Sequence, residues 1–223
     1  VHPNAQGDSL EKLDAVLSHC ASLDIQTNPQ KVGAGDPNPA WIVPLFAWYR
    51  KPEDGDGSLH HPRQGEDPDL PMWSDHYFIR WPNGVTGFRA AGHFLTLNKP
   101  HLQREYAAPV ITFSHFLPRQ ELVWSDPAHR SGPLPAFLQG FNFSRVAGDA
   151  KLDAQLRAIN AVIHIYGHQH RNRYCEIDGV LYVSHCLGYP FERAHGFIRG
   201  LGDGPKLIWD TVSKTKEISE KWG

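Results

Sequence analysis

The sequence predicts a mixed α/β domain in which helices are layered on a mixed sheet, and residues 1–223 are expected to form one domain. Three observations predict this class. The helical pattern DAKLDAQLRAIN runs directly into an apolar strand, AVIHI, and the β-branched run VITF predicts a second buried strand. The segment YCEIDGVLYVSHC then reads as two strands joined by Asp178-Gly179, which is a strong hairpin signal.

Composition and charge exclude several classes of protein. The chain has 40% hydrophobic residues and a formal net charge of −2, with 22 Lys and Arg against 24 Asp and Glu, which is typical of a soluble globular domain. No basic cluster is present that would bind a nucleic acid, and no apolar run approaches the roughly 20 residues that a membrane helix needs. Three scattered cysteines, Cys20, Cys175 and Cys186, indicate a reducing compartment, so we expect an intracellular, cytoplasmic protein.

The N-terminal half predicts a helix, a strand and a loop, in that order. Residues 9–23 place apolar side chains on one helical face, with Asp8 or Ser9 as the cap and Glu11 positioned to complete a capping box with Asp8. Residues 40–50, AWIVPLFAWYR, predict a strand, and Pro44 predicts that this strand lies at an edge or contains a bulge. Residues 51–71 are polar and rich in Gly and Pro, so we expect a long surface loop there.

The C-terminal half supplies the remaining predicted elements. In the helix of residues 149–160, Leu152, Leu156 and Ile159 share one face, which should pack on the sheet. The segment KLIWDTVS, residues 206–213, predicts one more strand.

Histidines follow two of the predicted strands. The chain has 14 histidines, and His115 follows the strand VITF, whereas His168 and His170 follow AVIHI within the motif GHQH. Loops beyond the carboxyl ends of strands in such sheets gather ligand sites, so we expect these three imidazoles to converge. Gly167, which has no side chain, should let the backbone turn tightly enough for two rings to approach one site. Neutral imidazoles bind divalent cations, and a set of histidines suits Zn, Fe, Ni or Cu better than Mg or Ca.

Three longer segments, VITFSHFLPR, IYGHQHRNRY and DGVLYVSHCLGYPFER, resemble the C-terminal half of the calcineurin-like metallophosphoesterase superfamily. The resemblance implies a layered sandwich of mixed sheets of the metallophosphoesterase type and hydrolysis of a phosphoester substrate. It implies two divalent metal ions, drawn from Mn, Fe and Zn, in a binuclear centre. His115 and His168 would bind one ion, and His170 would bind the other.

The superfamily's earlier motifs are absent from this sequence. These are an Asp-x-His, a Gly-Asp followed by a second Asp, and a Gly-Asn-His motif, which supply the bridging aspartate and the catalytic histidine. The resemblance therefore implies a fold that is incomplete at its N-terminus, with the catalytic histidine upstream of Val1. We expect this chain alone to be a poor enzyme.

Other histidines and arginines have a structural and a functional interpretation. His164 alternates with isoleucines inside a strand and reads as a core residue, whereas His185 could orient a ligand imidazole or simply pack. His60 and His61 lie in the polar loop and should be solvated, and Trp73 and Trp81 should be packing residues. Arg119 and Arg193 each follow a motif, so they could bind a substrate phosphate through a bidentate fork or form surface ion pairs.

Two other classes of function fit the same residues. A single-zinc structural or binding module would use His115, His168 and His170 together with Cys175 in a closed site with four ligands. A non-catalytic interaction domain would keep the fold without the metals. The substrate, whether monoester, diester or phosphoprotein, and the oligomeric state are not fixed by these patterns.

Overall fold

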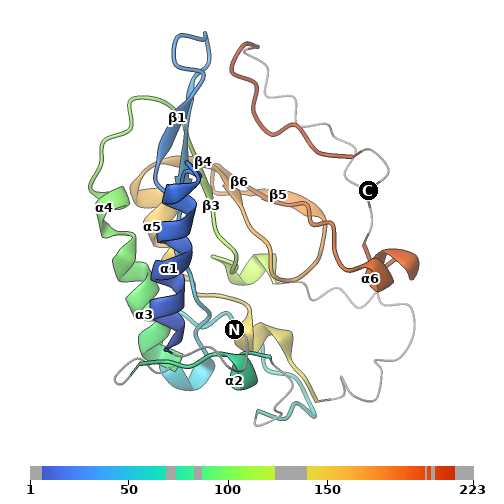
Figure 1. The fold of residues 1–223 in the computed structure, drawn as a ribbon. Coiled ribbons are helices and arrows are strands. Elements are labelled where there is room, and N and C mark those ends of the chain that lie inside the picture. The colour runs from blue at the N-terminus through green and yellow to red at the C-terminus, as the bar shows by residue number, and fades with distance from the viewer. Residues whose placement is uncertain are drawn as a thin grey trace.

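A six-stranded mixed sheet forms the centre of the molecule in a computed structural model that describes residues 7–68, 74–82, 87–123, 140–198, 200–201 and 204–213 (Figure 1). The strands follow the order β1-β2-β3-β4-β6-β5 across the sheet. Their bounds are Gln30–Val32 for β1, Ala40–Pro44 for β2, Val110–Phe113 for β3, Ala161–Ile165 for β4, Arg173–Ile177 for β5 and Val180–Ser184 for β6. Strands β2, β3, β4 and β6 are parallel, and both edge strands pair antiparallel. The mixed α/β class is confirmed, although the described residues form one sheet and not a sandwich of two.

Helices flank the sheet on the side of β1 to β4, and one short helix lies beyond its other edge (Figure 1). Their bounds are Ser9–Ser22 for α1, Asp75–Phe78 for α2, Gly87–Leu97 for α3, Lys99–Leu102 for α4, Lys151–Ala158 for α5 and Pro190–Ala194 for α6. Among the described residues, 3-10 turns lie at η1 (Pro52–Asp54), η2 (Gln120–Leu122) and η5 (Phe143–Val146). Within the described ranges, no helix is both long and apolar enough to cross a bilayer.

The first helix begins as predicted. The Asp8 carboxylate accepts hydrogen bonds from the backbone amides of Leu10 (2.8 Å) and Glu11 (3.0 Å), and the Glu11 carboxylate accepts one from the amide of Asp8 (3.0 Å). These reciprocal bonds satisfy the first amides of the helix. The predicted apolar face is only partly covered, because Val16 remains 49% exposed.

The prediction that Pro44 marks an edge strand is wrong. Strand β2 lies between β1 and β3, and Pro44 is its last residue, paired with Phe113. The pairing with β1 ends at Ile42, so the missing N–H of Pro44 leaves no gap in a ladder. The Pro44 carbonyl accepts a hydrogen bond from the buried ring of His101 (3.0 Å).

The prediction of a strand at residues 206–213 is also wrong. The Asn38 side-chain amide donates to the carbonyls of Asp210 (2.8 Å) and Ser213 (3.2 Å), and the Trp209 indole donates to the Asn38 carbonyl (3.0 Å). Ile208 and Trp209 pack against the buried sheet residues of the cluster Ala40, Ile111, Ile163 and Val183. The segment therefore covers one face of the sheet and adds no strand to its edge.

The predicted surface loop is packed over the part that the structure describes, residues 51–68. Leu59 is fully buried, and His60 lies 2.8 Å from the Glu66 carboxylate with its side chain only 13% exposed, so the prediction of a solvated His60 is wrong. Asn142 donates to the His61 carbonyl (2.6 Å), which joins the loop to the segment that precedes α5. His61 itself is exposed, as predicted, whereas residues 69–71 and Trp73 lie outside the described residues.

His164 is a core histidine, as its place in the strand predicts. Its ring is fully buried in β4, with Nδ1 2.8 Å from the Thr112 hydroxyl and Nε2 3.2 Å from the Ser114 hydroxyl. Burial lowers the pKa of His164 to about 3, so the ring is neutral at physiological pH. Protonation of this ring therefore opposes folding.

Replacing His164 by glutamine should flatten the acid dependence of stability. An unfolded histidine has a pKa of about 6.5, so between pH 6.5 and about 3 the unfolded chain binds one more proton than the folded chain at this residue. Its contribution to stability is complete above pH 6.5 and is lost as the pH falls, at about 1.4 kcal/mol per pH unit. Urea unfolding between pH 4.5 and 7 should show that the free energy of unfolding of His164→Gln lacks this pH dependence.

The exposed His195 provides the control, because His195→Gln should keep the wild-type slope. A His164→Gln variant with the same pH dependence as the unmodified chain would show that this ring does not stay neutral in the fold.

Candidate functional site

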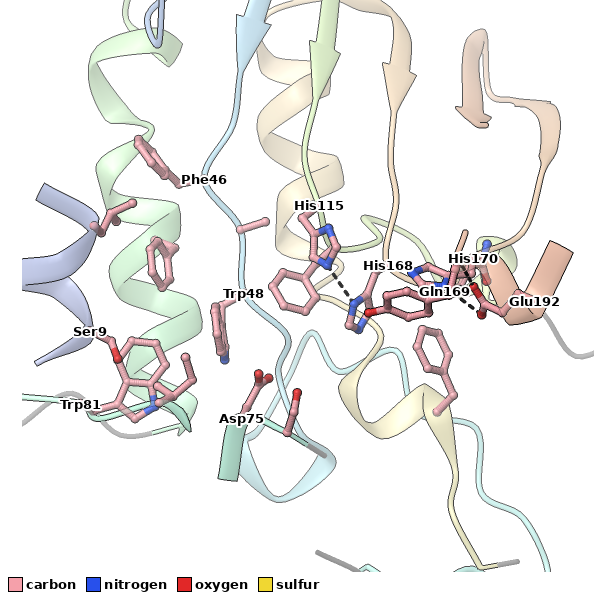
Figure 2. Close-up of a pocket in the computed structure, with 18 residues that line it drawn as sticks. Ser9, Phe46, Trp48, Asp75, Trp81, His115, His168, Gln169, His170 and Glu192 are labelled. Atoms are coloured by element: carbon pink, nitrogen blue, oxygen red, sulfur yellow. Dashed lines mark hydrogen bonds and ion pairs between the residues drawn. The ribbon is translucent and has the colours of Figure 1, made fainter. Parts of the chain in front are cut away.

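A cleft of about 850 Å³ opens beyond the carboxyl ends of β3 and β4 (Figure 2). His115, His168 and His170 all line it, so the predicted histidines share one cavity. Asp75, Gln169 and Glu192 add polar groups, and aromatic side chains form much of the remaining wall. The cleft therefore has the size of an ordinary ligand site and combines polar with aromatic lining residues.

The parallel pairing of β3 and β4 brings two of the histidines into contact. The ladder continues past the strands through the Ser114 amide to the Ile165 carbonyl (3.0 Å) and the Gly167 amide to the His115 carbonyl (3.1 Å). As a result, Nε2 of His115 lies 3.1 Å from Nδ1 of His168, although 53 residues separate them (Figure 2).

The ring of His168 is held in one orientation. Its Nε2 lies 2.9 Å from the Val146 carbonyl, which can only accept a hydrogen bond, so Nε2 carries the proton and Nδ1 presents its lone pair toward His115. Phe116 packs on the same ring, with centroids 4.5 Å apart. Burial and the neighbouring His115 ring lower the pKa of His168 to about 3. Burial and the His170 ring also lower the pKa of His115, against the opposing charge of Asp75.

His170 has a different partner. Its Nδ1 lies 2.9 Å from the Glu192 carboxylate, and the ring of Tyr189 contacts it edge-on at 5.1 Å between centroids. The carboxylate accepts a hydrogen bond from Nδ1, and in the neutral form of the ring Nε2 is then the acceptor. The hydrogen bonds of His168 and His170 to a carbonyl and a carboxylate are those that orient metal-binding imidazoles in proteins.

The described residues fit one metal ion better than two. Two nitrogens bound to one tetrahedral zinc ion at about 2.05 Å lie about 3.3 Å apart, close to the 3.1 Å that separates the rings of His115 and His168. Over the described parts of the chain, no group of three or more His, Cys, Asp or Glu side chains gathers as a metal site. A binuclear centre is therefore not formed by these residues alone.

Within the GHQH motif, the two histidines and not the glycine adopt a strained backbone conformation. His168 has φ +71° and His170 has φ +49°, both in the left-handed region that costs non-glycine residues about 1–2 kcal/mol. Gly167 does not adopt a positive φ, and a Cβ atom there would lie 3.5 Å from Nδ1 of His115, which is an ordinary contact. The expectation that Gly167 makes the turn is wrong. Strained backbone at two polar side chains that line a cleft is an observation from which a functional role can be proposed.

The predicted phosphate-binding arginines lie outside the lining of the cleft. Arg119 forms ion pairs with Glu121 (2.6 Å), Asp178 (3.1 Å) and Asp153 (3.3 Å). Arg193 donates hydrogen bonds to the backbone carbonyls of residues 187 (3.0 Å) and 188 (2.6 Å). Both guanidinium groups therefore have structural partners, and their role toward substrate stays a prediction.

Cys175 and His185 also lie apart from the histidine pair. Cys175 packs half-buried against the main core cluster, so it does not complete a site with the histidines among the described residues. Nε2 of His185 lies 3.0 Å from the Gly204 carbonyl, and a role of this ring in orienting a ligand imidazole stays a prediction. Trp81, expected to be a packing residue, contacts Trp48 and also lines the cleft.

Sequence reasoning missed two acidic residues of the cleft, Asp75 and Glu192. Glu192 is the N3 residue of α6, where its carboxylate also accepts a hydrogen bond from the Tyr189 amide (2.6 Å). A glutamate at this position after Pro190 is a helix-start signal, so the sequence predicts a capping role for Glu192. It does not predict that Glu192 is the partner of a distant histidine. Asp75 stands at the start of the short helix α2, and no sequence spacing connects it to the strand ends.

Comparison with known proteins gives a likeness in fold. No family model matches the sequence, and no curated protein matches it. A solved structure, phosphopantetheinyl hydrolase from Mycobacterium tuberculosis, matches with a TM-score of 0.61 at 20% sequence identity. The match covers 87% of this chain and 66% of that one, so the chain spans just under two thirds of that protein's length.

These comparisons correct the superfamily assignment. Membership of the calcineurin-like metallophosphoesterases would predict a matching family model, and none matches, whereas the solved structure that shares the fold is named phosphopantetheinyl hydrolase. The resemblance depended on short segments around strand ends, and similar site residues arise on unrelated folds. The assignment to the calcineurin-like metallophosphoesterases is therefore wrong.

The strain at His170 can be measured directly. Glycine adopts a positive φ without the Cβ penalty, so His170→Gly should be about 1 kcal/mol more stable than His170→Ala in urea unfolding. His195, at the end of α6 with φ −97°, provides the matched pair, where alanine should be at least as stable as glycine. The same order at both positions would contradict a left-handed turn at His170.

Proposed function

We propose that the cleft hydrolyses phosphoesters with a divalent metal ion held by His115 and His168. One observation carries this proposal: the two ring nitrogens are 3.1 Å apart, and the other nitrogen of His168 is anchored on the Val146 carbonyl. The chain shares its fold with a solved structure named phosphopantetheinyl hydrolase, and this likeness supports hydrolysis as the general class of reaction.

Each side chain has a defined task in this proposal. His115 and His168 hold the ion, and the Val146 carbonyl fixes the tautomer of His168. A bound divalent ion lowers the pKa of a water molecule and clamps phosphoryl oxygens. Glu192 holds the Nδ1 proton of His170, so Nε2 of His170 can accept a proton or bind a second ion. Imidazole donors favour Zn or Fe over Mg, and a second ion at His170 is part of the proposal.

A metal-binding module without catalysis is the second candidate. It is favoured by the observation that the described residues supply two histidines and no third ligand for one ion. An ion with so few protein ligands depends on water and substrate for the rest of its coordination. We therefore expect turnover by this chain to be slow if the first proposal holds.

Hydrolysis assays with and without metal test the proposed function. The chain, treated with chelator and then supplied with Zn or Mn, should release p-nitrophenol from p-nitrophenyl phosphate or from bis(p-nitrophenyl) phosphate. Turnover should fall at least about tenfold in His115→Ala and in His168→Ala, since each removes half of the protein's ligand set. His195→Ala, which changes an exposed ring outside the cleft, should keep the full rate.

Bound metal without turnover of either ester would favour the non-catalytic module. Turnover that is unchanged in both histidine variants would place the chemistry elsewhere and contradict the proposal.

A further inference from the structure

The cleft has a second end that the proposed chemistry does not use. The end toward α1 and α3 carries Phe46, Trp48 and Trp81, with Ser9 beside Trp81 and Asp75 near Trp48 (Figure 2). Phe94 and Leu13 also line the cleft. An aromatic wall of this size next to a reactive site needs an apolar occupant or must be covered by protein.

The aromatic rings of the wall pack on one another. Trp48 stacks on Phe94 with centroids 5.6 Å apart and planes at 19°, and Trp81 meets Trp48 edge-on at 5.0 Å and 86°. Phe94 is only 7% exposed, and its buried ring contacts the rings of Trp48 and Trp81. Preorganised aromatic surfaces bind a flat apolar group at little cost in side-chain entropy.

Phe116 connects the wall to the histidine pair. Its ring lies 5.1 Å from that of Trp48 and 4.5 Å from that of His168, measured between centroids. A molecule whose phosphoryl group sits at His115 and His168 would therefore place its organic group along Phe116 toward Trp48.

The charges of the described lining residues disfavour recognition of a second anionic group. The ionisable side chains that line its described part are Asp75, Glu192 and the three histidines, with no lysine or arginine among them. Among the described lining residues, a polyanionic ester would meet two carboxylates and no lysine or arginine. Apolar contact is the remaining means by which this cleft can select the organic group.

We propose that the substrate is a phosphoester of a bulky apolar alcohol or phenol, whose ring or hydrocarbon body lies on Trp48 and Trp81. This proposal rests on the proposed function for the phosphoryl end, and it assigns Trp81 and Leu13 as residues that determine specificity. Its test measures binding of the organic group separately from hydrolysis.

Binding of two phosphoesters in chelator isolates the contribution of the organic group. Calorimetric Kd values for 2-naphthyl phosphate and ethyl phosphate share the phosphoryl term, so their ratio reports the aromatic end alone. We expect 2-naphthyl phosphate to bind at least about tenfold more tightly. Trp81→Ala should reduce that preference to within about threefold, whereas Phe78→Ala, which changes a half-exposed ring outside the cleft, should retain it. Equal affinities for the two esters in the unmodified chain would overturn the proposal.

Leu13→Lys distinguishes an apolar occupant from an anionic one. This half-buried residue of α1 lines the aromatic end, and lysine is compatible with the helix. A cation there should weaken binding of 2-naphthyl phosphate if the naphthyl ring occupies this end. Tighter binding would show that the anionic group lies there and would overturn the proposal.

The two proposals fail in different ways. A naphthyl preference in binding, together with no hydrolysis of any ester in the presence of Zn or Mn, would remove the proposed function and leave the apolar site. Hydrolysis that depends on His168, with equal kcat/KM for naphthyl and ethyl esters, would keep the proposed function and overturn this inference.

Discussion

The parallel register between β3 and β4 is the constraint on which the site depends. Thr112 pairs with His164 and Phe113 with Ile165, and the two hydrogen bonds beyond the strand ends hold His115 beside Gly167. Since side chains alternate faces along a strand, a shift of one residue would send His115 and His168 to opposite sides of the sheet. Ile111 and His164 are fully buried. They oppose such a shift because it would move their side chains out of these buried positions.

A second layer of contacts supports the strained turn. The Val146 carbonyl that orients His168 belongs to η5, whose first turn is capped by Asn142 through the Ser144 amide (3.2 Å). Just beyond η5, Asp149 forms a fully buried ion pair with Arg50 (2.8 Å). Breaking a buried pair leaves one charge without compensation, so this contact fixes the segment that follows β2 against the start of α5. The left-handed residues of the turn are thereby stabilised from outside the strands.

Local patterns predicted much of the fold and less of the site. The hairpin follows from Asp178 and Gly179, whose φ values of +50° and +79° match the turn that this dipeptide favours. The strand-end positions of His115 and His168 were visible because apolar runs end just before them. The buried loop around Leu59 and the extended segment at Trp209 could not be predicted from the sequence. Neither the polar composition of the loop nor the apolar run of the segment shows which distant residues supply the hydrogen bonds. Asp75 and Glu192 reach the cleft through tertiary packing, so no spacing along the chain could reveal them.

A double-mutant cycle on Zn²⁺ affinity tests the central claim that His115 and His168 hold one ion together. The Kd for Zn²⁺ would be measured by calorimetry for the unmodified chain, His115→Ala, His168→Ala and the double variant. If the two rings share an ion, each single change should weaken binding by about tenfold or more, and the double variant should bind only slightly more weakly than either single variant. Losses that simply add in free energy, or single variants that bind Zn²⁺ as tightly as the unmodified chain, would contradict a shared site.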